Sequence, residues 1–110
     1  MNQNKQIEQN ANQPQLPTQL KAVLRIVTAD NELKQKALPF VNVERREINW
    51  QKIFAQDFGS GHRAALVWAK ILWMDESPVK VDAFDRAFSM DNRLREAVIE
   101  ALVIRWGLGH

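Results

Sequence analysis

Hydrophobic residues recur with helical spacing along most of the chain, beginning at Leu20. One stripe, spaced i, i+3, i+4 and i+7 as on one face of a helix, consists of Leu20, Val23, Leu24 and Val27. We expect Thr18 to cap this helix, because threonine is a favoured N-cap. Asp30 or Asn31 should cap a second, shorter helix that carries Leu33 and ends before Pro39, since proline cannot continue a helix.

The next segment changes its pattern twice. Residues 40–48 alternate at Val41, Val43 and Arg45 but offer no obvious partner strand, so we predict a connector. Asn49 is a suitable cap for a further helix, and glycine and serine at positions 59–61 should interrupt it. The predicted apolar face of this helix consists of Trp50, Ile53, Phe54 and Phe58.

A helix from about residue 62 to residue 74 is predicted to be the centre of the core. At 100° per residue, only Arg63 and Lys70 share a polar line, and every other direction holds an apolar side chain. A helix that is apolar almost all round is buried. Trp68 and Trp73 point about 140° apart on it, so neighbours should cover more than one side.

The C-terminal part predicts a turn at residues 75–78 and two more helices. The first of these helices bears Ala83, Phe84, Ala87 and Phe88. Asp91 should cap the last, over residues 92–106, and Gly107 should end it. The chain is therefore predicted to be all-α, a compact orthogonal bundle of five or six helices, with residues 16–110 as one domain. Residues 1–15 contain five glutamines and four asparagines, which predicts a disordered tail.

The last predicted helix has more apolar surface than one core requires. One of its faces carries Leu94, Val98 and Ala101. Ile99, Val103 and Trp106 form a second face about 140° away, whereas a surface helix usually needs a single apolar stripe. We therefore predict that these three residues line a subunit interface.

Composition narrows the functional classes. The 110 residues are 45% hydrophobic and 25% charged, as in an ordinary globular protein, and none is cysteine. Disulfide scaffolds, cysteine-ligated metal sites and thiol catalysis are thereby excluded. The longest apolar run, residues 64–74, is too short for a membrane span, which needs about 20 residues. With no signal-peptide pattern in the first residues, we expect a cytoplasmic protein.

The turn between the two middle helices is the first candidate for chemistry. Ser60, Gly61, His62 and Arg63 open a buried helix, where free N–H groups and the helix dipole can bind an anion. The glycine spacing and lysine of a phosphate loop are missing, however. The favoured interpretation is structural: Gly59 ends one helix, Ser60 caps the next, and Gly61 permits close packing.

Two further constellations could carry chemistry. Asp57 lies on an otherwise apolar arc and could orient His62, as a carboxylate orients a catalytic base, but no nucleophile accompanies the pair. A bond from Asp57 to backbone N–H groups or to an arginine is the favoured alternative. The acidic residues of the second set lack the spacing of a calcium loop, and no metal site is predicted there. This set consists of Asp75, Glu76, Asp82 and Asp85.

The balance of charge disfavours nucleic acid as a partner. Fifteen basic residues against thirteen acidic ones give a formal charge of +2, and acidic neighbours blunt the arginine clusters. The leading hypothesis is a protein that acts through protein–protein contact, as a homodimer or with another protein, without a cofactor, a metal or catalytic residues. The alternatives are a nucleic-acid-associated regulator and a protein that binds a small ligand or anion at the turn of residues 59–62.

Overall fold

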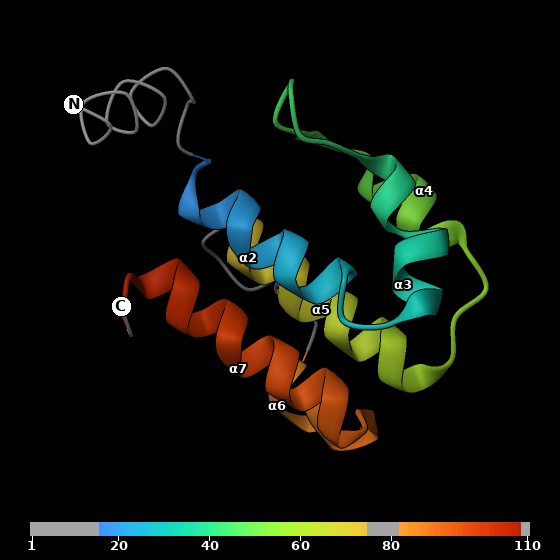
Figure 1. Ribbon diagram of the computed structural model, residues 1–110. Coiled ribbons are helices and arrows are strands. Elements are labelled where there is room, and N and C mark those ends of the chain that lie inside the picture. Colours follow the sequence, from blue (N-terminus) through green and yellow to red (C-terminus); the bar gives the residue numbers. More distant parts are fainter. Residues whose placement is uncertain (1–15, 75–81, 109–110) are drawn as a thin grey trace.

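The computed structural model describes residues 16–74 and 82–108, and in these ranges the chain is helical (Figure 1). The α-helices are α2 (Thr18–Val27), α3 (Asn31–Lys36), α4 (Trp50–Ala55), α5 (Ser60–Met74), α6 (Ala83–Arg86) and α7 (Asn92–Trp106). The 3₁₀ turns are η1 (Leu38–Phe40) and η2 (Ala87–Ser89). The short strands β1 (Val41–Asn42) and β2 (Glu47–Ile48) form an antiparallel pair. The all-α prediction is confirmed.

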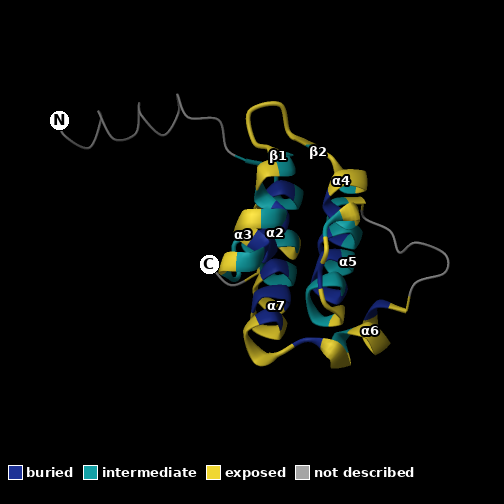
Figure 2. Ribbon diagram, turned by 90° about the vertical axis from the view of Figure 1, so that its right-hand side faces the viewer, coloured by how far each residue is buried: buried dark blue, intermediate teal, exposed yellow. Residues whose placement is uncertain are grey.

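The three longest helices, α2, α5 and α7, lie alongside one another and pack pairwise into the core (Figures 1 and 2). These three helices run alongside one another and do not cross at right angles. Their arrangement therefore differs from the orthogonal packing that we predicted for the bundle. The short helices α3 and α4 continue the bundle at one end, and α6 lies at the start of α7. The predicted tail of residues 1–15 and the predicted turn at 75–78 fall outside the described residues.

Helix α5 is the central element, as its sequence predicts. No residue from 61 to 73 is exposed, and neighbours in contact with the helix include α2, α7 and α6. The Trp68 indole nitrogen donates to the Ala83 carbonyl at 3.1 Å, which ties α5 to the start of α6. The buried side chains of α5 are Ala64, Ala65, Leu66, Ala69 and Leu72.

The helix starts show which capping predictions hold. Asp30 caps α3 by accepting from the Leu33 N–H at 3.0 Å, as predicted. Thr18 was expected to cap α2, but Pro17 occupies the cap position. The Thr18 hydroxyl instead accepts a hydrogen bond from Arg105 at 3.2 Å, so it links α2 to α7.

Residues 40–48 contain a pair of short strands, whereas we predicted a connector without a partner strand. Val41 pairs with Ile48, and Asn42 pairs with Glu47, so the strand finds its partner within the same nine residues. Asn42 stabilises the turn by accepting from the Arg45 N–H. The positive φ of Arg46, 57°, reverses the chain, and neither feature belongs to a hydrophobic pattern.

Helices α4 and α5 are separated by a longer break than the glycines predict. Asn49 caps α4 through the Lys52 N–H, as predicted. The helix ends at Ala55, so Phe58 lies beyond it, although its side chain is buried in the same core. Helix α5 begins at Ser60 rather than near His62.

The last helix begins and ends where the sequence predicts. Asp91 caps α7 by accepting from the Leu94 N–H at 2.9 Å. Gly107 ends the helix in the left-handed region at φ 71°, which favours glycine. In α6 and η2, Ala83 is buried, but Phe84 and Phe88 are exposed.

In the part of the chain that the structure describes, no helix has both the length and the apolar character needed to cross a membrane.

Candidate functional site

The turn at the start of α5 is shaped by close packing. A Cβ placed on Gly61 would lie 2.7 Å from the carbonyl oxygen of Ser89, a backbone atom. The absence of a side chain therefore lets α5 approach η2 and the first turn of α7. The predicted packing role of Gly61 is confirmed. Ser60 was predicted to cap α5, but it is exposed and is already the first residue of the helix.

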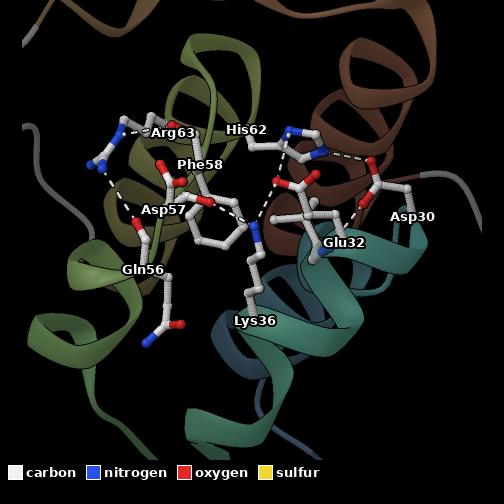
Figure 3. Close-up of polar contacts among 9 residues, drawn as sticks. Asp30, Glu32, Lys36, Gln56, Asp57, Phe58, His62 and Arg63 are labelled. Carbon is white, nitrogen blue, oxygen red and sulfur yellow. Dashed lines mark hydrogen bonds and ion pairs between the residues drawn. The ribbon is translucent and has the colours of Figure 1, made fainter.

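His62 lies between two carboxylates at the start of α3, those of the cap residue Asp30 and of Glu32 (Figure 3). Its Nε2 is 2.7 Å from Oδ2 of Asp30, and its Nδ1 is 3.8 Å from Oε2 of Glu32. The predicted partner of His62, Asp57, is exposed and does not orient the ring. The carboxylates of Asp30 and Glu32 face the ring instead. Only the backbone carbonyl of Asp57 takes part in the cluster, by accepting from Lys36 Nζ at 2.7 Å.

The Asp30 carboxylate is used by two donors at once. Oδ1 accepts from the Leu33 N–H, and Oδ2 faces the His62 ring. Burial alone would raise the pKa of this carboxyl, but the Leu33 and His62 hydrogen bonds favour its ionised form. The pKa of Asp30 consequently lies below its usual value.

Arg63 is held by backbone carbonyls of the preceding segment. Its guanidinium donates to the carbonyls of Phe54, Gln56 and Phe58 at 3.2–3.3 Å. These groups follow or end α4, where carbonyls lack helical partners. Arg63 therefore stabilises the chain reversal between α4 and α5, and its donors face the protein's own backbone (Figure 3).

The polar cluster as a whole connects three elements. Lys36 lies 5.4 Å from the centre of the Phe58 ring, and Phe58 stacks on His62 at 5.9 Å between ring centres. The His62 ring, the Lys36 ammonium group and the Arg63 guanidinium all have partners within the chain. The geometry accounts for the cluster as a tie between α3, α5 and the end of α4.

A second candidate site is the outer face of α7, which none of the described helices covers. On this face, Ile99 is 60% exposed and Trp106 is 67% exposed, and Val103 between them is half-buried. The opposite face, with Leu94, is buried against α2 and α5. The two apolar faces predicted for this helix are both present, and only one of them is in the core.

Beside Ile99, the surface is hollowed into an apolar groove between α5, α6, η2 and α7. The groove has a volume of about 280 Å³. Arg95 is its one charged residue among those described, and this guanidinium donates to the carbonyls of Ala87 and Phe88. The apolar lining consists of Trp68, Phe84, Ala87, Met90, Val98, Ile99 and Leu102.

Two aromatic rings extend this apolar surface past the start of α7. Phe84 and Phe88 are 70% and 72% exposed, and their rings meet edge to face at 5.9 Å between centres. The sequence pattern predicted their helical spacing but not their exposure. The sequence contains only a weak signal for their exposure. Both residues lie in a short segment flanked by charged residues, and such a segment can present either face to solvent.

Among residues 16–74 and 82–108, no group of three or more histidine, cysteine, aspartate or glutamate side chains is arranged to hold a metal ion. Asp82 caps α6 through the Asp85 N–H, and the other two members of the acidic set fall outside these ranges.

We compared the chain with protein-family models, with curated proteins and with solved structures, and none of them matches it.

Proposed function

We propose that this chain is a small cytoplasmic helical protein that acts through protein–protein contact, beginning with contact between copies of itself. The observation that carries the proposal is the outer face of α7. Ile99 and Trp106 remain exposed on this face, although the opposite face of the helix packs against α2 and α5. Exposed apolar surface of this kind is typical of interaction sites.

The size of the apolar surface supports a protein partner. Taking about 200 Å² for a fully exposed large side chain, the residues concerned expose roughly 650 Å² together. They are Phe84, Phe88, Ile99, Trp106 and Leu108. Homodimer interfaces are about 65% apolar, so this surface corresponds to roughly 1,000 Å² on each subunit. A standard stable interface needs about 800 Å² on each side.

The two alternatives receive less support from the geometry. Arg95 and Arg105 donate to carbonyls of the chain itself, and Arg25 pairs with Glu100, which leaves fewer cations for a phosphate backbone. At the turn of residues 59–62, the Arg63 guanidinium faces carbonyls and His62 faces carboxylates. An incoming anion would meet negative charge there.

Sedimentation equilibrium tests the proposal. The wild-type chain should form a dimer at micromolar concentration, since closed two-fold assemblies are the commonest homo-oligomers. Val103→Glu should separate it, because a carboxylate buried without a partner costs several kcal/mol, against about 8 kcal/mol for a micromolar association. The variant should stay helical by circular dichroism, as Val103 is only half-buried in the single chain.

Gln51→Glu is the matched control, because it makes the same change of charge at an exposed position of α4. This variant should remain a dimer. A wild-type chain that is monomeric across the micromolar range would overturn the proposal, and so would a Val103→Glu variant that unfolds.

A further inference from the structure

We infer that two copies of this chain pack their α7 helices antiparallel about a two-fold axis, and that each Trp106 enters the apolar groove of the other copy. This inference rests on the proposed self-association and adds to it the register and the residue that anchors the contact.

The first argument is the symmetry of the exposed stripe on α7. Its apolar positions, taken together, are Ile99, Leu102, Val103 and Trp106. A two-fold axis between Leu102 and Val103, perpendicular to the helix, exchanges these two positions with each other and exchanges Ile99 with Trp106. The set is therefore mapped onto itself, which is what a contact between identical patches requires.

The second argument is the placement of the other exposed apolar residues. Phe84 and Phe88 lie in α6 and η2, beside the start of α7, whereas Trp106 and Leu108 lie at its end (Figure 1). In the register set by this axis, the end of one α7 lies opposite Ile99, in the middle of the other α7, and Phe84 lines the same groove as Ile99. The aromatic pair of each copy is then covered by the partner's Trp106 and the partner's Leu108.

The third argument comes from charge. A parallel pair in the same register would place Arg95 against the partner's Arg95 and Glu96 against the partner's Glu96, and like charges repel. In the antiparallel register, both residues lie beyond the partner's apolar stripe. The antiparallel register therefore avoids both repulsive pairs.

The groove supplies the pocket for the anchor. Ile99 forms part of its wall, and the two-fold axis places the partner's Trp106 directly opposite Ile99. The groove is almost entirely apolar and is open to solvent in the single chain. Interface hot spots are enriched in tryptophan and lie in well-packed, desolvated pockets.

Disulfide trapping tests the register, and the absence of cysteine from the natural chain makes every introduced thiol unambiguous. Ile99→Cys and Trp106→Cys are prepared separately, and a 1:1 mixture is oxidised under mild conditions. The antiparallel register predicts a covalent dimer in the mixture that contains one chain of each variant. Either variant alone should cross-link weakly, because identical positions are separated by about 10 Å along the helix axis, beyond the reach of a disulfide.

The possible outcomes separate the two proposals. Strong self-linking of each variant alone would indicate a parallel pair and overturn the register, while a wild-type dimer in sedimentation would leave the proposed self-association intact. A monomeric wild-type chain would overturn both. A dimer with no cross-link between positions 99 and 106 in the mixture would also overturn the register.

Trp106→Ala tests the anchor separately. It should weaken dimerisation by roughly 30-fold or more, as expected for a hot-spot residue, and leave the helix content unchanged, because Trp106 is exposed in the single chain. Val43→Ala is the control, since it truncates another exposed apolar residue in the hairpin turn, away from α7. A Trp106→Ala variant that dimerises as well as Val43→Ala would overturn the anchoring role.

Discussion

Helices α5 and α7 are both 15 residues long, and both carry apolar residues on more than one face, yet they end in different environments. Helix α5 contacts α2, α4, α6, η2 and α7, and none of its residues from 61 to 73 is exposed. Helix α7 packs one face against α2 and α5 and leaves Ile99 and Trp106 in solvent.

The difference between the two helices shows how much one small core can cover. A single-chain domain of this size buries only a limited share of its surface. The elements that cover one helix on several sides are then too few to cover a second helix in the same way. The apolar surplus on α5 is absorbed by α2, α6 and α7, whereas the surplus on α7 has no remaining neighbour among the described elements. A similar sequence pattern thus leads to a core position in one helix and to a candidate interface in the other.

The largest effect that can test this comparison is the truncation of one aliphatic side chain on each helix. Leu66 of α5 is fully buried, so Leu66→Ala should lower the free energy of unfolding by about 2–5 kcal/mol. Ile99→Ala on α7 should lower it by less than about 1 kcal/mol when the chain is dilute enough to be monomeric. Urea denaturation measures both values, and equal losses would mean that α7 is as deeply buried as α5.

An intermediate effect is expected where α5 approaches η2, just before α7. Gly61→Ala places a Cβ 2.7 Å from the Ser89 carbonyl oxygen, and overpacking of this kind typically costs 1–3 kcal/mol. Gly59→Ala is the matched control, because nothing lies within 4 Å of its added Cβ; its cost should stay below about 1 kcal/mol. If thermal denaturation ranks the two variants equally, the close approach of α5 to η2 is wrong.

The elements of this fold were predictable where a local rule decides them. Asp30, Asn49 and Asp91 cap their helices as expected, because a cap depends only on the backbone three residues away. The paired strands of residues 40–48 were missed since their pairing depends on a turn with a positive φ at Arg46, which no hydrophobic pattern records.

The candidate sites were less predictable because they depend on packing between distant segments. The Asp30–His62 contact joins residues 32 positions apart, so neighbourhood in sequence pointed to Asp57 instead. The groove likewise needs Trp68 of α5 to lie beside Leu102 of α7. The stripe of Ile99, Val103 and Trp106, by contrast, lies on a single helix, and the wheel of that helix was enough to locate it.

The smallest expected effect concerns how the two helices are held at their starts. The first turn of α5 is tied to α3 through His62 and Asp30, whereas α7 begins with its own cap, Asp91. Asp30→Asn should cost about 0.5–1 kcal/mol at pH 7, since asparagine is a comparable cap and a partly exposed charged contact contributes little. Asp91→Asn is the matched control at that pH, because it makes the same change at a cap that contacts no histidine among the described residues.

The pH dependence of Asp30→Asn gives this last comparison its sharper form. The pKa of Asp30 is lowered in the folded chain by its hydrogen bonds to Leu33 and His62, which outweigh the opposing effect of burial. A carboxyl with a lowered folded-state pKa contributes stability above its unfolded pKa, about 3.9, and loses that contribution as the pH falls through the folded value. The wild-type chain should therefore lose stability more steeply than Asp30→Asn when urea denaturation is repeated from pH 6 down to pH 2. Parallel curves would mean that the carboxylate is not held in its ionised form, and the tie between α3 and α5 would then have to rest on the contact of His62 with Glu32 and on the packing of His62 against Phe58.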